Sequence, residues 1–252
     1  YSVIDWSHKG PDIDYTEAQY FATMKQALLM EELVTKHAAI MDKYDPQQKI
    51  ALVVDEWGGW YDVEKGTNPG FLFQQNSIRD AMVAGVTLNI FNNHADRVRI
   101  ANLAQCVNVL QAVILTNKEK MILTPTYHVM EMYKVHQNAI MLPLTVKGND
   151  YILNGQKLDA ISASASKDST GAIHISLVNI DPSHSQKITL SLGNENLKNI
   201  TGRILSAKKL QDYNSFSDPE KIKPVVFKDA TLDKNTITVT LAPASVVMLT
   251  VK

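Results

Sequence analysis

The spacing of the hydrophobic residues changes near residue 138, and this change constrains the fold more than any other feature of the sequence. Before it, apolar residues recur at helical spacing or stand in short unbroken runs. After it, they mostly recur at every second position. Unbroken runs are typical of parallel strands covered on both faces, and alternation is typical of antiparallel sheets with one face in water. The sequence therefore predicts two domains, an α/β part over residues 1–138 and an all-β part over residues 139–252.

The first part alternates between helical and strand patterns. Four segments carry them: a long helix over 15–44, a buried strand over 50–54, and helices over about 71–92 and about 126–136. Residues 98–103 fit a second buried strand, although 102–115 also fits a helix. Such alternation indicates βα units and a parallel sheet. Only two or three such units are visible, whereas a closed (β/α)8 barrel has eight in roughly 250 residues, so we expect this part to be the closing third of one.

The second part is rich in short strand patterns. Six are evident, over residues 161–165, 172–180, 187–192, 201–207, 236–241 and 246–251. In the third of them Ile188, Leu190 and Leu192 share one face, as in a sheet with one side in water. Asn154-Gly155 and Gly193-Asn194 are turn signals between strands. We expect an antiparallel, jelly-roll-like β-sandwich.

Composition excludes several classes of function. The 252 residues include 25 Lys+Arg and 26 Asp+Glu, a formal net charge of -1, and no dense basic run, which argues against a nucleic-acid or anionic-membrane partner. The single cysteine, Cys106, rules out an intrachain disulfide and an all-cysteine zinc site. The histidines lack metal-ligand spacing, and there is no Gly-rich phosphate loop, so we predict no metal and no cofactor. No apolar run approaches the roughly 18–20 residues of a membrane span.

Two acids stand directly after the predicted strand over residues 50–54. Active sites of α/β barrels lie at this end of the strands. Alternation places Glu56 on the face of Leu52 and Val54 and places Asp55 on the opposite face. Only one of the two carboxylates is therefore expected to point into the mouth of a barrel.

Aromatic residues follow these acids at once. Trp57, Trp60 and Tyr61 offer flat faces suited to packing against a sugar ring. Gly58-Gly59 permit an unusual turn or the close approach of a ligand. The pattern indicates carbohydrate chemistry. The alternative is a solvated strand end whose tryptophans belong to the core.

Four motifs in a fixed order extend this pattern: DEWGGWY at 55–61, RDAMVAG at 79–85, NHADRV at 93–98 and NLAQCVNV at 102–109. With them the chain resembles the C-terminal half of glycoside hydrolase family 51, which consists mainly of α-L-arabinofuranosidases. The resemblance covers residues 1 to about 137. The sandwich region matches the family by position and pattern.

The resemblance implies a role for several residues. Glu56 would be the catalytic nucleophile at the end of the seventh barrel strand. Trp60 matches a sugar-stacking position, and Gln105 matches a substrate contact near the end of the eighth strand. Tyr1 matches the tyrosine of a His-x-Tyr motif after the sixth strand. Some relatives have Asn at the position of Gly58.

The resemblance also implies a retaining mechanism, in which a second carboxylate acts as acid and then as base. The family carries that residue in an Asn-Glu pair after the fourth strand. The only such dipeptide here, Asn194-Glu195, falls in a predicted turn of the sandwich region. We therefore expect the acid/base to lie outside this chain, in a missing N-terminal half. The sequence begins at Tyr1 without an initiator Met, which suggests the C-terminal piece of a longer protein or a chain with a cleaved leader.

The expected function is release of terminal α-L-arabinofuranosyl residues from arabinose-containing oligosaccharides or polysaccharides. The alternatives are another retaining glycosidase, such as a xylosidase or endoglucanase, and a non-catalytic sugar-binding fragment. The expected partners are the saccharide and the missing half, with a homo-oligomer left open and with neither nucleic acid nor membrane. The compartment stays open between cytoplasmic and periplasmic or secreted.

Overall fold

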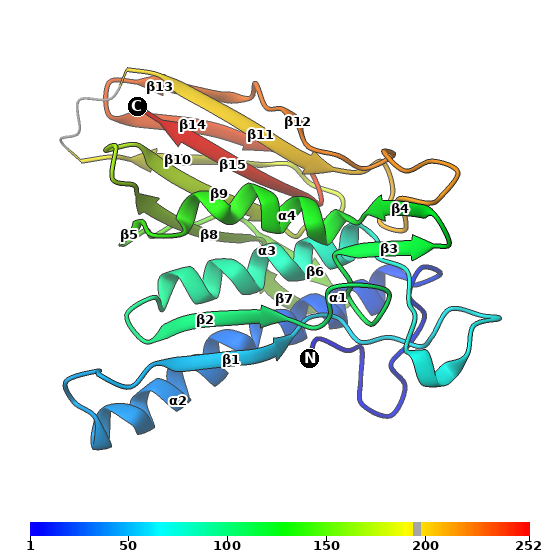
Figure 1. Ribbon diagram of the computed structural model, residues 1–252. Coiled ribbons are helices and arrows are strands. Elements are labelled where there is room, and N and C mark those ends of the chain that lie inside the picture. Colours follow the sequence, from blue (N-terminus) through cyan, green and yellow to red (C-terminus); the bar gives the residue numbers. More distant parts are fainter. Residues whose placement is uncertain (194–197) are drawn as a thin grey trace.

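The computed structural model describes residues 1–193 and 198–252, and it arranges them in layers (Figure 1). A part built of helices and parallel strands lies at the bottom of the view, and a stack of antiparallel strands lies at the top. The elements of the first part are α1 (Glu17–Leu28), α2 (Met30–Tyr44), β1 (Leu52–Trp57), α3 (Ile78–Asn93), β2 (Val98–Leu103), β3 (Ile114–Asn117), β4 (Lys120–Leu123) and α4 (Pro125–Tyr133). Short 3-10 helices cover Pro69–Phe71 and Lys134–His136.

Capping residues mark the N-termini of α3 and α4, whereas no side chain caps the start of α2. The predicted helix over 15–44 is two helices, because α1 ends at Leu28 and α2 starts at Met30. The helix expected from residue 71 begins only at Ile78, since Ser77 and Asp80 form a capping box there. Thr124 caps α4, and Pro125 occupies its first turn, as the sequence predicted.

The two parallel strands are those expected from the sequence. β1 pairs with β2 in parallel, which confirms the strand over 98–103 and makes the helical interpretation of 102–115 wrong. Within the described residues β1 and β2 form a two-stranded sheet, so this chain by itself shows no closed barrel. After β2 the chain runs through an irregular segment into the β3–β4 hairpin, which periodicity did not reveal.

The second part is built from antiparallel pairs. A six-stranded sheet has the order β12-β11-β15-β9-β8-β5, and a three-stranded sheet has the order β10-β14-β13. The strands are β5 (Ile140–Leu142), β8 (Ile161–Lys167), β9 (Ile173–Asn179), β10 (Gln186–Ser191), β11 (Ile200–Ser206), β12 (Val225–Val226), β13 (Ala230–Asp233), β14 (Thr236–Leu241) and β15 (Ser245–Val251). Side chains of both sheets share one apolar cluster, so they stack face to face as a sandwich.

Details of the sandwich bear out the alternation read from the sequence. Ile188 and Leu190 in β10 are buried, while Lys187 and Thr189 are exposed. A hairpin of β6 (Asp150–Leu153) and β7 (Gln156–Asp159) turns at Asn154-Gly155, where both residues have positive φ, 50° and 75°. The turn predicted at Gly193-Asn194 extends beyond the described residues.

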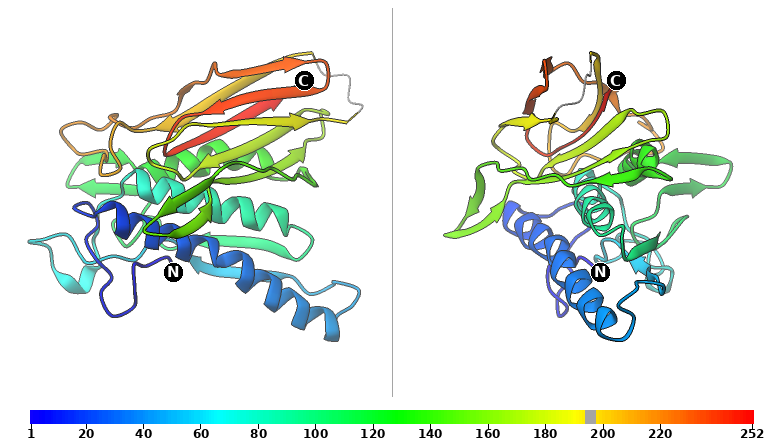
Figure 2. Two further views of the ribbon diagram at one scale, coloured as in Figure 1. Left: turned by 180° about the vertical axis from the view of Figure 1, so that it is seen from behind. Right: turned by 90° about the vertical axis from the view of Figure 1, so that its left-hand side faces the viewer.

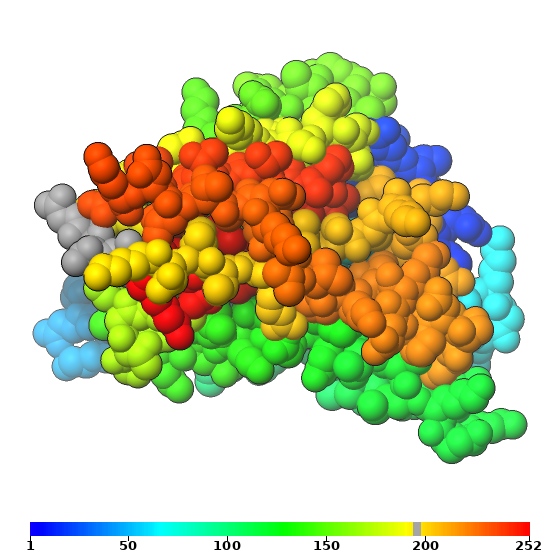
Figure 3. Space-filling model, turned by 90° about the horizontal axis from the view of Figure 1, so that it is seen from above, coloured from blue at the N-terminus to red at the C-terminus, as the bar shows by residue number. Residues whose placement is uncertain are grey.

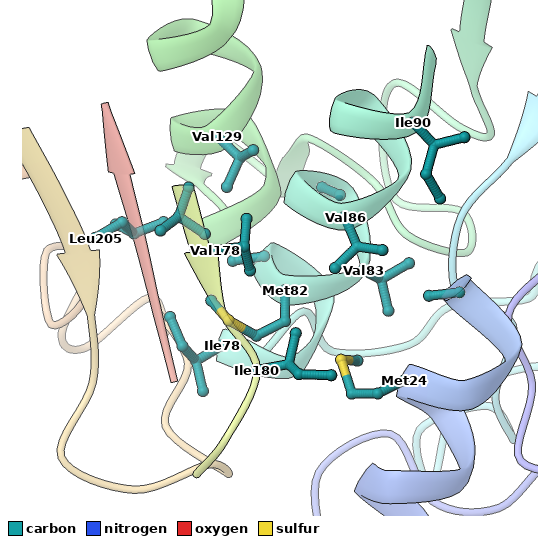
Figure 4. Close-up of a cluster of buried hydrophobic side chains, with 14 of the residues drawn as sticks. Met24, Ile78, Met82, Val83, Val86, Ile90, Val129, Val178, Ile180 and Leu205 are labelled. Atoms are coloured by element: carbon teal, nitrogen blue, oxygen red, sulfur yellow. The ribbon is translucent and has the colours of Figure 1, made fainter. Parts of the chain in front are cut away.

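Helix α3 connects the two parts. It is buried along most of its length and packs against α1 and α4 as well as against β8 and β9. Figure 4 shows its side chains Met82, Val83 and Val86 beside Met24 of α1 and Val178 of β9. A Cβ at Gly85 would lie 2.7 Å from Cγ2 of Val178, so glycine permits this close approach of helix to sheet. One core therefore spans both parts.

Two further views show how the helices and the loop after β11 lie relative to the sheets. Figure 2 (right) shows the stacked sheets above α3, with α1 and α2 on the far side of that helix. Seen from above, the segment that follows β11 lies beside the β3–β4 hairpin (Figure 3), where Phe216 packs with Ala112, Leu115 and Ile122. Among the helices formed by the described residues, none has both the length and the apolar character of a membrane span.

Candidate functional site at the end of β1

The end of β1 is irregular, and this irregularity decides where Glu56 points. Val54 pairs with Ala101 and Trp57 pairs with Leu103, so three steps along β1 lie opposite two steps along β2. An extra residue of this kind is a β-bulge, which re-aims the side chains that follow it.

The bulge places Trp57, not Glu56, on the core face of the strand. Trp57 is fully buried with its ring 5.8 Å from that of Phe91, in the cluster against which Leu52 and Val54 pack. Glu56 is exposed. The expectation that Glu56 shares the face of Leu52 and Val54 is therefore wrong, because strict alternation ends at Val54.

Glu56 is held by the first residue of the chain. The hydroxyl of Tyr1 donates a hydrogen bond to Oε2 of Glu56 at 2.7 Å. Partial burial, together with the bond and the charge of Glu56, raises the pKa of Tyr1 to about 12. The phenol thus keeps its proton near neutral pH and remains a donor to the carboxylate. The neighbouring Asp55 instead accepts a bond from Nδ2 of Asn102 at 3.3 Å.

Trp60 stands beside this pair. Its ring lies 5.1 Å from that of Tyr1, centroid to centroid, at an interplanar angle of 75°. The Lys9 ammonium nitrogen lies 5.1 Å from the Trp60 ring centroid. Three of the residues singled out from the sequence, Tyr1, Glu56 and Trp60, therefore form one cluster.

Backbone pairing brings the N-terminal segment to the end of β1. The N–H of Ser2 donates to the carbonyl of Gly58 at 2.8 Å, and the N–H of Trp60 donates to the carbonyl of Ser2 at 3.2 Å. Gly58 has φ of 129°, a region that strongly favours glycine. The Gly58-Gly59 pair thus forms the unusual turn that its sequence predicted.

Gln105 lies just past the end of β2 and is exposed. The N–H of Ala104 donates to the carbonyl of Trp57 at 3.1 Å, which extends the β1–β2 pairing by one step. The peptide between Ala104 and Gln105 is cis. Gln105 therefore follows the neighbouring strand at the same edge of the sheet that carries Glu56.

Two further residues of this region escaped prediction. Gln74 and Gln111 are buried, and their side-chain amides bond the backbone of Gly59. Both lie in irregular segments without hydrophobic periodicity. The only hint in the sequence was the glycine pair itself, because a turn that leaves a strand needs partners for its backbone groups.

Asn194-Glu195 lies outside the described residues. No group of three or more His, Cys, Asp or Glu side chains with metal-binding geometry occurs in the part of the chain that is described.

Comparison with known families agrees with the motifs. Residues 55–245 match the family described as the α-L-arabinofuranosidase C-terminal domain. An intracellular exo-α-L-arabinofuranosidase of Bacteroides ovatus is 46% identical over 251 residues, covering 99% of this chain and 49% of that protein. The chain thus spans about half the length of this curated relative.

Solved structures give the same result. A GH51 arabinofuranosidase from Xanthomonas axonopodis pv. citri superposes with a TM-score of 0.98 at 45% identity, over 100% of this chain and 51% of that one. An α-L-arabinofuranosidase from Thermotoga maritima, solved with arabinose, matches with a TM-score of 0.76 at 20% identity, over 92% of this chain and 49% of that one, and so shares the fold.

Proposed function

Because this chain belongs to the α-L-arabinofuranosidases of glycoside hydrolase family 51, we propose that it carries the nucleophile half of a retaining exo-glycosidase. The substrate class is a terminal α-L-arabinofuranosyl residue of an arabinose-containing oligosaccharide or polysaccharide. The relatives' names supply the sugar, and the site geometry supports the division of roles among residues.

The observation that carries the proposal is the cluster at the end of β1. Glu56 is exposed there, its carboxylate accepts a bond from Tyr1, and Trp60 lies against Tyr1. An accessible carboxylate beside an aromatic ring is the arrangement that a sugar-attacking nucleophile requires.

In the proposed mechanism Glu56 attacks the anomeric carbon and forms a covalent glycosyl-enzyme. The Tyr1 hydroxyl donates to one oxygen of this carboxylate, which orients the group so that the other oxygen faces the sugar. Trp60 packs on the apolar face of the ring, and Gln105 contacts it from the end of β2. Water then attacks the intermediate with help from the second carboxylate.

That second carboxylate is proposed to come from the part of the polypeptide preceding this chain. Retaining enzymes place the two carboxyl groups about 5–5.5 Å apart. β1 and β2 would be the seventh and eighth strands of a (β/α)8 barrel, with residues 1–138 as its closing part and residues 139–252 as the sandwich domain. Val53 and Ile100, paired across β1 and β2, are 41% and 50% exposed. This exposure is consistent with an inner barrel face that the other strands of the barrel would cover.

Helix α2 supports the same interpretation. Its flank carries exposed apolar residues at helical spacing, namely Leu33, Ile40 and Tyr44, with Leu29 just before it. In a complete barrel a neighbouring helix would cover such a row. This 252-residue chain by itself is therefore proposed to lack turnover.

The test uses the full-length polypeptide that contains this chain and an aryl α-L-arabinofuranoside. Glu56→Ala is expected to lower kcat by about a thousand-fold or more and to abolish covalent labelling by an arabinose-shaped mechanism-based reagent. Asp168→Asn, a carboxylate of the sandwich bonded to His174, serves as the control and should leave kcat within about twofold.

Other results would favour the alternatives. Labelling of Glu56 by a xylose-shaped reagent in preference to the arabinose-shaped one would indicate a xylosidase or related hydrolase. If wild type and Glu56→Ala bound the sugar equally well and neither turned it over, the protein would be a non-catalytic binding module. All three tryptophans lie in the first 60 residues, so the sandwich offers no tryptophan platform for such binding.

The curated relative from Bacteroides ovatus is described as intracellular. We propose the same compartment for this protein, to be tested by fractionating cells and assaying both fractions with the aryl substrate.

A further inference from the structure

Two buried amides bond the turn between Glu56 and Trp60. Nε2 of Gln74 donates to the carbonyl of Gly59 at 3.1 Å, and Oε1 of Gln111 accepts from the Gly59 N–H. Oε1 of Gln74 also accepts from the N–H of Tyr61 at 2.9 Å. Gln74 is 1% exposed and Gln111 is 0% exposed. Both backbone groups of Gly59 are thus bonded to side chains from distant segments.

The opposite side of the turn is held by Ser2, through the bonds to Gly58 and Trp60 described above. The backbone on either side of the Trp60 side chain is therefore bonded from two directions. Such a turn has little freedom to rotate, and the indole it carries is held beside Tyr1 and Glu56.

The Gln111 amide is itself fixed. Its Nε2 donates to the carbonyl of Asp80 at 2.8 Å and to Oγ1 of Thr126 at 2.9 Å. Because these acceptors take the NH2 group, the amide oxygen must face Gly59. Gln111 thereby ties the turn to the first turn of α3 and the first turn of α4.

The glycines permit this approach. A Cβ at Gly58 would lie 3.2 Å from Oε1 and 3.3 Å from Cβ of Gln111. A Cβ at Gly59 would lie 2.5 Å from the Tyr61 hydroxyl oxygen. A side chain at Gly58 would push the turn away from Gln111, and one at Gly59 would displace the Tyr61 ring within the turn.

We propose that Gln74 and Gln111 are positioning residues that hold the Gly58–Tyr61 turn so that Trp60 presents its ring to the sugar. Neither glutamine is proposed to touch the substrate. Two apolar side chains of similar size would fill the same space. They would not fix the orientation of the turn's backbone, because hydrogen bonds impose that orientation. This inference rests on the proposed function of the Glu56 site.

The experiment compares Gln74→Met and Gln111→Met in the full-length polypeptide, because methionine keeps the length of the side chain and removes its hydrogen bonds. Each substitution is expected to raise KM for the aryl arabinofuranoside about tenfold, through the loss of bonds to the turn. The value of kcat should stay within about threefold, because Glu56 and its contact with Tyr1 remain.

A double-variant comparison separates positioning from general damage. Trp60→Ala alone should raise KM, and adding Gln111→Met to it should change KM by less than about twofold, since the ring that Gln111 positions is gone. Thr126→Val leaves Gln111 in place but removes one acceptor of its amide, together with the bonds between the Thr126 hydroxyl and the Asn76 amide. It should raise KM in the same direction by a smaller factor, even if Gln111→Met does not fold.

Asn214 is the matched control. This buried side chain, 2% exposed, donates to the carbonyls of Leu123 and Ile222 and accepts from the N–H of Ile222. Asn214→Leu therefore removes a comparable buried amide outside the Glu56 cluster. It should lower Tm as the glutamine variants do and leave KM unchanged.

Unchanged KM in the methionine variants and in Thr126→Val, or KM effects that multiply with that of Trp60→Ala, would overturn this inference. If Glu56→Ala retained turnover, the proposed function itself would fail. An inactive Glu56→Ala together with wild-type KM in the glutamine variants would reject only the positioning role.

Discussion

The sandwich and the β1–β2 pair bury their strands to different extents. In the sandwich, β9 and β15 face β10 and β14 across one core, and residues such as Leu177 and Val239 are fully buried. In the β1–β2 pair, one face packs against the core around α3 while the other exposes Val53 and Ile100. The difference teaches that a run of apolar residues predicts a strand but does not by itself show that both faces of the strand are covered within these 252 residues.

The largest expected difference lies in the response to truncation of an apolar side chain. In this 252-residue chain, Leu177→Ala should lower the free energy of unfolding by about 2–5 kcal/mol, because it leaves a cavity in the sandwich core. Val53→Ala should change it by less than about 0.5 kcal/mol, since the side chain is 41% exposed. Urea denaturation followed by circular dichroism measures both.

The same pair of substitutions in the full-length polypeptide sharpens the comparison. Val53→Ala should then cost about 0.5–1.5 kcal/mol or more, because the proposed barrel would bury its side chain. An equally small effect in both polypeptides would mean that the face of β1 stays open and would contradict the barrel proposal.

A pH-dependent effect of intermediate size is expected where the two parts meet. His136, just after α4, contacts the hydroxyls of Ser166 and Ser176 in the sandwich at 2.7 and 3.1 Å. Burial, and to a lesser degree the charge of His174, lowers the pKa of His136 to about 4. The imidazole of His136 therefore binds a proton more readily in the unfolded chain than in the folded chain. Its contribution to the free energy of unfolding is lost as the pH falls from about 6.5 to about 4.

The measurement compares wild type with His136→Gln by urea denaturation at pH 7 and pH 4. The stability advantage of wild type should shrink by on the order of 1–3 kcal/mol between these values. Burial raises the pKa of Asp80 to about 6, which gives an opposite slope, but this contribution is common to both proteins and cancels. Parallel pH profiles would show that the histidine is not buried between the two parts.

The smallest expected difference between the two regions concerns a pair of glycines with positive φ. Gly155 (φ 75°) has open space around its Cα, so Gly155→Ala should cost about 1 kcal/mol through backbone strain alone. Gly58 (φ 129°) faces Gln111 and Leu103 at 3.2–3.3 Å, so Gly58→Ala should cost more and should also raise KM. If both substitutions cost the same stability and neither changed KM, the turn at Gly58 would be packed no more tightly than the β6–β7 hairpin turn at Gly155.

The sequence predicted the elements whose cause is local. The strands over 187–192 and 236–241 appear as β10 and β14, and the Asn154-Gly155 turn joins a hairpin as expected. Their patterns arise from pleat geometry and turn conformation, which depend on neighbouring residues. The predicted domain boundary near residue 138 remains a prediction, since the core around α3 includes residues from both sides of it.

Prediction from the sequence was weaker for features that depend on contacts between residues far apart in the chain. The buried-strand pattern of 50–54 implied cover on both faces, yet Ile50 is 63% exposed in this chain. The extended helix expected over 71–92 was shortened by a capping box at Ser77, whose effect exceeded the apolar pattern before it. The β3–β4 hairpin lay in a segment with no clear period.

By itself the sequence determined the change from βα units to antiparallel strands, the motif DEWGGWY and its family, because spacing and residue type carry this information along the chain. Only the tertiary structure decided that a bulge turns Glu56 away from the core and that Tyr1, 55 positions earlier, bonds its carboxylate. The same holds for the glutamines that bond Gly59. Register shifts and long-range hydrogen bonds depend on how separate segments pack, and no local pattern encodes that packing.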